Sequence, residues 1–143
     1  MRRMWVVIWV VLMGCGDLSP SVVANVSISA SLQNTTDNLS VSVFAPRRSD
    51  DIILVCSTLV FWDEHRLDPD DSRLQRLAYD TWRLTDGSEP LLLNDVPSGE
   101  NRVVYVAAYS ATHVLLGHGC TDNVTILPQQ ESAVTVRVYP VSF

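Results

Sequence analysis

The sequence predicts an all-β protein, an antiparallel β-sandwich of about seven strands with one short helix at about residues 69–76. Two observations favour this fold. Apolar and polar residues alternate over several short segments, which is the period of a half-buried strand. Clusters of Asn, Asp, Ser, Gly and Pro separate these segments at short intervals, as turns do in all-β domains. No internal repeat or low-complexity segment interrupts the pattern.

The chain has 143 residues, a length that suits one domain. We expect a signal peptide at residues 1–14, a lipidated tether at 15–24 and the β-sandwich domain at 25–143. The formal net charge is −6 for the whole chain. An acidic domain repels a phosphate backbone, so we expect no nucleic-acid partner.

The amino-terminal segment has the composition of an export signal. Arg2 and Arg3 precede a run of ten apolar residues, MWVVIWVVLM, and such a run is too short to span a bilayer, which needs about 20 residues. The alternative is a fully buried strand or helix at the start of a cytosolic domain. A start with two arginines fits that alternative poorly.

The residues that follow, Leu12-Met13-Gly14-Cys15, resemble the lipobox of bacterial lipoproteins. The resemblance implies cleavage before Cys15, a diacylglyceryl thioether on its sulfur and acylation of the new amino terminus. Several acyl chains on one residue anchor a protein stably. Gly16 stands where that family's inner-membrane retention signal would place Asp, so the resemblance implies the outer membrane. The alternative is an ordinary cleaved signal and a secreted protein without lipid.

Once the resemblance assigns Cys15 to lipid, Cys56 and Cys120 remain. An even number of cysteines in an exported protein predicts a disulfide, because the compartment is oxidising. Such a bond would close a loop of about 65 residues and stabilise the fold by several kcal/mol in the chain-entropy model. The alternative is a pair of buried free thiols.

The strands can be placed in chain order from the alternation. Residues 25–32 and 39–45 predict two strands that form a hairpin around the turn cluster QNTTDN. Residues 52–62 are an apolar run typical of a buried strand. Asp68-Pro69-Asp70-Asp71 has the pattern of a helix start, with a capping Asp and Pro at the first position, and a strand is expected to follow it.

The carboxyl-terminal half contains the clearest strand, residues 102–109 (RVVYVAAY). Further strands are expected at 114–120, 123–127 and 133–139. Leucines 91–93, followed by Asp-Val-Pro-Ser-Gly and an aromatic-bearing strand, resemble transthyretin-like and carboxypeptidase-regulatory-like domains. The run from Tyr105 to Cys120 also resembles small β-sandwich lipoproteins of Gram-negative bacteria such as myxobacteria. These resemblances imply a prealbumin-like or Ig-like sandwich and no residue-level function.

His113, His118 and Cys120 lie close in sequence, yet they lack the paired spacing of a structural zinc site, and Cys120 is better assigned to the disulfide. We therefore expect no metal and no other cofactor. The acidic segment 63–71 (DEHRLDPDD) is the best place for an ion such as calcium, although it lacks the Gly turn and terminal Glu of an EF-hand loop. A solvated loop followed by a helix cap explains it more simply.

No motif of nucleophilic, metal-dependent or phosphate-binding catalysis is present in the sequence, so we expect no catalytic residues and no enzyme. Four aromatic residues could line a ligand groove, although such residues in strands are more often part of the core: Trp62, Tyr79, Trp82 and Tyr105. The sequence thus predicts a membrane-anchored envelope lipoprotein with a noncatalytic structural or binding domain that contacts a protein or a glycan. The alternative is a small calcium-binding protein or enzyme that uses the acidic segment.

Overall fold

The computed structural model describes residues 19–60, 67–84 and 90–141 of the chain. Within these ranges it contains seven strands and one short helix. In chain order they are β1 (Ser21–Ile28), β2 (Asn38–Phe44), α1 (Ser57–Val60), β3 (Arg76–Arg83), β4 (Leu91–Leu93), β5 (Gly99–Tyr109), β6 (Leu115–Ile126) and β7 (Glu131–Pro140). The predictions of an all-β protein and of about seven strands are confirmed.

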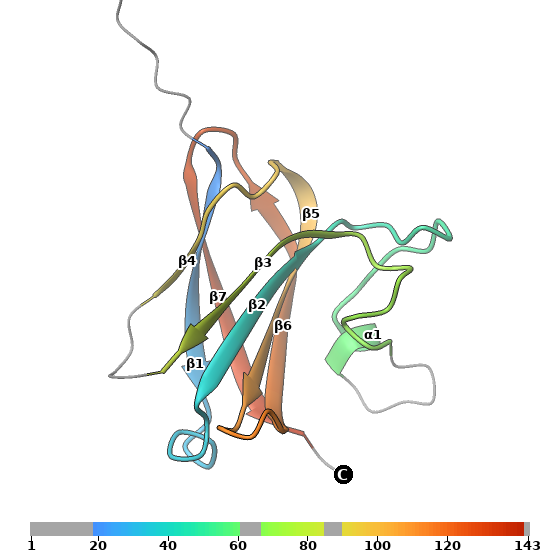
Figure 1. The fold of residues 1–143 in the computed structure, drawn as a ribbon. Coiled ribbons are helices and arrows are strands. Elements are labelled where there is room, and N and C mark those ends of the chain that lie inside the picture. Colours follow the sequence, from blue (N-terminus) through green and yellow to red (C-terminus); the bar gives the residue numbers. More distant parts are fainter. Residues whose placement is uncertain (1–18, 61–66, 85–89, 142–143) are drawn as a thin grey trace, which may run out of the picture.

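The strands form one mixed sheet in the order β3-β2-β5-β6-β7-β1-β4. Neighbouring strands in this sheet are antiparallel except for β1 and β7, which run parallel from the pair Ser21 and Glu131 to the pair Ile28 and Val138. The sheet curves strongly and is nearly barrel-shaped, with its edge strands β3 and β4 brought toward each other (Figure 1). The expectation of purely antiparallel pairing is therefore wrong at the pair formed by the first and last strands.

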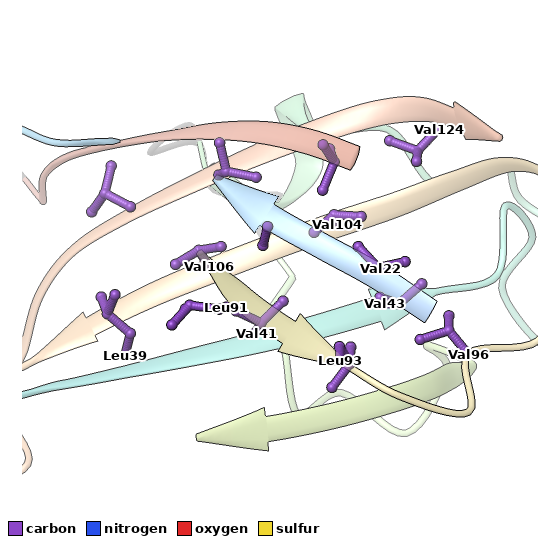
Figure 2. Close-up of a cluster of buried hydrophobic side chains, with 14 of the residues drawn as sticks. Val22, Leu39, Val41, Val43, Leu91, Leu93, Val96, Val104, Val106 and Val124 are labelled. Carbon is purple, nitrogen blue, oxygen red and sulfur yellow. The ribbon is translucent and has the colours of Figure 1, made fainter. Parts of the chain in front are cut away.

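The interior of the curved sheet is an aliphatic core (Figure 2). Leu39, Val41 and Val43 of β2 face inward beside Val104 and Val106 of β5, as the alternation predicts. Burying each of these side chains stabilises the fold by about 1.5–3 kcal/mol relative to exposure. The same interior is completed by apolar residues of the other strands, among them Val22, Leu91, Leu93, Val124, Val136 and Val138.

Strand β5 is buried on both faces. Its outward residues Val103, Tyr105 and Ala107 form a second apolar cluster with leucines of the connection between β2 and β3. We call the described part of this connection, residues 45–60 and 67–75, the cover segment. It carries α1 and lies outside the sheet (Figure 1). The leucines that it contributes to the second cluster are Leu54, Leu59, Leu67 and Leu74.

The first strand and its partner differ from the prediction. Residues 21–24, expected in the tether, belong to β1, because Val22 and Ala24 already face the core. Residues 29–32 were expected in the strand but lie outside it, and Leu32 is buried in the core from a turn. The predicted hairpin is wrong, since β1 pairs with β7 and β4 whereas β2 pairs with β3 and β5.

The described residues of the expected strand 52–62 also take another course. Ile52 and Ile53 are exposed, and residues 57–60 form α1. The helix expected at 69–76 is absent, and turns stand in its place. Asp68 and Asp71 accept hydrogen bonds from the backbone N–H two residues further on, which favours successive turns over a helix start. The strand expected after this region is confirmed as β3.

The two short strands expected at 114–120 and 123–127 are one continuous strand, β6. The polar pair Asp122 and Asn123, which interrupts the apolar pattern, lies where the register with β5 shifts, and Asn123 has a φ of 54°. A local irregularity of this kind accommodates an extra polar residue without ending the strand.

Candidate binding site

A hollow of about 220 Å³ lies on the outer face of the sheet, beside the cover segment. The strand register explains its position. Ser42 of β2 lies directly between Tyr79 of β3 and Tyr105 of β5, and all three side chains line the hollow. Small serines between large tyrosines leave space above the strand. The described lining residues are Ser40, Ser42, Asp68, Pro69, Asp70, Arg76, Tyr79, Tyr105, Tyr109 and Leu115.

The floor of the hollow is a set of neutral hydroxyl groups. The Tyr105 hydroxyl and His118 Nδ1 share a hydrogen bond of 3.1 Å, and Ser40 forms a side-chain hydrogen bond with Tyr109. Ser42 is only 2% exposed and lines the hollow, so its hydroxyl lies where a group that enters the hollow can meet it.

The tyrosine at the back of the hollow keeps its proton at neutral pH. Burial of the ring raises the pKa of the Tyr109 hydroxyl, and nearby Tyr79, Asp70 and Asp68 also raise it, although the hydrogen bond with Ser40 acts in the opposite direction. Desolvation disfavours the phenolate because the charged form loses more hydration than the neutral form. Tyr109 therefore offers a neutral hydroxyl that can both donate and accept.

The rim of the hollow is braced by Arg76. Its guanidinium lies 4.7 Å from the centre of the Tyr79 ring and donates to Asp70 Oδ1 at 2.9 Å and to the Pro69 carbonyl at 3.2 Å. The ion pair is exposed and adds little stability, but it fixes the position of the 68–70 turn. With two carboxylates and one guanidinium among the described lining residues, the hollow carries a formal charge of −1.

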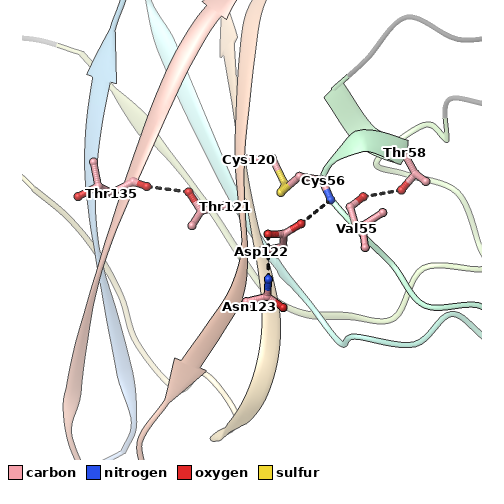
Figure 3. The surroundings of a disulfide bond; sticks show 8 residues. All are labelled: Val55, Cys56, Thr58, Cys120, Thr121, Asp122, Asn123 and Thr135. Carbon is pink, nitrogen blue, oxygen red and sulfur yellow. Dashed lines mark hydrogen bonds between the residues drawn. A yellow bond between two sulfur atoms is a disulfide. The ribbon is translucent and has the colours of Figure 1, made fainter.

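The predicted disulfide between Cys56 and Cys120 is confirmed and holds the cover segment to β6 (Figure 3). The backbone N–H of Cys56 also donates to Asp122 Oδ2 at 3.1 Å, two residues beyond Cys120. Cys120 pairs in register with Tyr105, a residue of the hollow's floor. The covalent bond therefore joins the cover segment to the sheet next to the hollow.

The histidines near Cys120 do not gather around a metal. His118 is buried against Tyr105, His113 lies in an exposed turn with a φ of 61°, and Cys120 is in the disulfide. In the described ranges, no three His, Cys, Asp or Glu side chains are grouped so as to hold a metal ion.

In the described part of the acidic segment 63–71, two of the three aspartates pair with arginines. Asp70 pairs with Arg76, and Asp71 pairs with Arg73 at 2.7 Å. The side-chain hydrogen bond from Arg73 holds the pKa of the Asp71 carboxyl well below its usual range. Residues 63–66 lie outside the described residues, so the calcium alternative stays a prediction.

Of the four aromatic residues proposed for a groove, Tyr79 and Tyr105 line the hollow, and Trp82 packs against the core. Trp62 lies outside the described residues. Sequence reasoning did not single out Ser40, Ser42 and Tyr109 as site residues. The serines were visible only as the polar half of an alternating strand, because their place between tyrosines depends on a strand pairing that the sequence pattern does not show.

The lipobox and Cys15 also lie outside the described residues. Within the part of the chain that the structure describes, no helix has the length and apolar character needed to cross a membrane. No protein-family model, curated protein or solved structure matches this chain.

Proposed function

We propose that the protein is an envelope lipoprotein, anchored by acylated Cys15 at the outer membrane, whose domain is a noncatalytic binding module. The disulfide between Cys56 and Cys120 is the observation that carries the location, because disulfides persist in oxidising compartments such as the periplasm and the cell surface. It agrees with the export signal and the lipobox in the sequence.

The start of β1 supports a short tether to the lipid. Six residue steps separate Cys15 from Ser21, the first residue of β1, and even a fully extended chain of that length spans only about 20 Å. The domain is then held close to the bilayer by the end at which β1 begins. The hollow lies on the side of the sheet, where a partner has access from the envelope.

The hollow supports binding rather than catalysis. A serine nucleophile needs a base within hydrogen-bond reach, and His118, the histidine beside this site among the described residues, forms its hydrogen bond with Tyr105. The carboxylate of Asp70 is paired with Arg76. The remaining groups, hydroxyls and aromatic rings, are those that recognise a ligand without changing it.

The proposed partner is an envelope protein or a glycan, and the acidic charge argues against nucleic acid. We keep a prealbumin-like or Ig-like sandwich, with its first and last strands parallel, as the finer fold proposal. Its support is the narrow junction of β6 with β7, which pair only at Gly117 with Pro140 and His118 with Tyr139. A junction of two residue pairs would allow the two parts of the sheet to face each other as layers.

Intact-mass spectrometry of the full chain made in a Gram-negative host, without reductant, tests the proposal. We expect a chain that begins at triacylated Cys15 and lacks the two hydrogen atoms lost on disulfide formation. The matched control is Cys15→Ser, which should remain unlipidated and keep the disulfide. An unlipidated wild-type mass would refute the anchor, and recovery of the protein in the soluble fraction would refute the location.

A further inference from the structure

We infer that the hollow between β2, β3, β5 and the 68–70 turn binds a neutral saccharide ring, such as the terminal sugar of an envelope glycan. This inference rests on the proposed role as a binding module and names the ligand class of that site. It follows from the pattern of hydroxyls, from the size of the hollow and from the charges at its rim.

The hydroxyl pattern matches a polyhydroxylated ligand. Sugar hydroxyls donate and accept at the same oxygen, and so do the serine and tyrosine hydroxyls of the floor. Ser42 lies between Tyr79 and Tyr105 in the register of the three strands and lines the hollow with them, so a ligand hydroxyl that enters the hollow can exchange hydrogen bonds with its oxygen.

The size of the hollow restricts the ligand to a small group. Its volume of about 220 Å³ is below that of pockets for drug-sized molecules, which measure roughly 300–1,000 Å³. Tyrosine rings at its wall offer rigid faces that are apolar at the centre and polar at the tip. A single pyranose ring has the same two characters, with apolar C–H faces and a polar edge.

The charges argue against both kinds of ion. An anionic group would meet Asp68 and Asp70, and the one arginine among the described lining residues is already paired with Asp70. A cationic group would compete with Arg76, whose guanidinium already pairs with the Asp70 carboxylate and lies near the Tyr79 ring. A neutral ligand competes with no charged group for the Asp70 carboxylate.

Binding of the full-length protein in detergent to an array of neutral mono- and disaccharides is the test, followed by calorimetry with the methyl glycoside of each sugar that binds. Oligolysine and heparin serve as cationic and anionic probes. We expect saturable binding of at least one neutral glycoside with a Kd below about 10 mM. Ser42→Ala should weaken it about tenfold, which is the effect of one lost hydrogen bond.

Tyr79→Ala provides a second variant that is safe for folding, since Tyr79 is 51% exposed, and it should also weaken binding at least about tenfold. The matched controls are Tyr139→Ala, at a tyrosine 57% exposed on β7, and Ser27→Ala on β1, and both should bind as the wild type does. Absence of neutral glycoside binding, preference for oligolysine or heparin, or unchanged binding by both site variants would overturn the inference. A lipidated mass in that case would leave the anchored-lipoprotein proposal standing.

Discussion

Replacing both Cys56 and Cys120 by alanine tests how much the covalent link between the cover segment and β6 stabilises the fold. The two residues are separated by 64 positions in the chain. In the chain-entropy model a closed loop of this length lowers the entropy of the unfolded state enough to stabilise the native state by about 4 kcal/mol. That is a large share of the roughly 5–15 kcal/mol by which proteins of this kind are stable.

The structure also predicts where the loss is felt first. The cover segment packs on the outer face of β5 through Leu54 and Leu59, whereas the core behind β5 is built from other strands. Without the disulfide, the cover segment should open locally more often than the sheet unfolds. The amide of Leu54, bonded to the Pro46 carbonyl at 2.8 Å, should lose more hydrogen-exchange protection than the amide of Val106.

Urea unfolding of the double variant and of the oxidised wild type measures the free-energy difference, and hydrogen exchange measures its distribution. Ser57→Ala, an exposed change next to Cys56, is the control and should alter the free energy of unfolding by less than about 0.5 kcal/mol. A loss below about 1 kcal/mol in the double variant would refute the loop-entropy reasoning. Equal loss of protection at Leu54 and Val106 would refute the local opening.

Two further predictions concern close packing and charge. Gly119→Ala should destabilise the protein by about 1–3 kcal/mol, because a Cβ at this position would collide with the Arg137 carbonyl of β7. Ser27→Ala is the control. An unchanged urea midpoint of the Gly119→Ala variant would contradict the prediction, because it would show that β6 and β7 can move apart there. Asp71→Asn should lower stability above about pH 4, because the depressed pKa of the Asp71 carboxyl means that its ionised form stabilises the native state. The difference from the wild type should decrease as the pH falls below about 4 and vanish once the carboxyl is protonated in the native state. Because the pair with Arg73 is exposed, the effect should be small and should shrink with added salt, and a difference that persists at low pH in urea titrations would contradict this account.

The local sequence pattern was sufficient to predict a strand where apolar and polar residues alternate within that strand. Val41 and Val104 were placed in strands from sequence, and both face the core in the structure. The partners of the strands were not visible in the same way, since the pairing of Val26 with Val136 joins residues from opposite ends of the chain. A local pattern contains no information about such a partner, and a turn cluster between two strands suggests a hairpin by default.

The cover segment shows a second limit of prediction from local sequence patterns. Ile53 lies in an apolar run, yet it is 60% exposed, because the neighbouring Leu54 satisfies the contact with the sheet. The Asp residues near 70 suggested a helix cap, although the same side chains also favour turns, and the tertiary contacts of Leu67 and Leu74 determine the outcome. The hollow could be predicted only as two aromatic candidates, since its serines acquire their role from the register of three strands.

The position of β1 has a mechanical consequence. This strand is held along its whole length, Ser21–Ile28, by parallel β7, and near its beginning also by β4. A pull transmitted from a lipid on Cys15 would act along the axis of β1, so the hydrogen bonds to β7 would be sheared together and not peeled one after another. Rupture under force depends on the unfolding barrier rather than on equilibrium stability, and here the hydrogen bonds of the β1–β7 pair would have to break together. The strand that begins the domain is thus the one through which the fold would resist a pull on the amino terminus along its whole length.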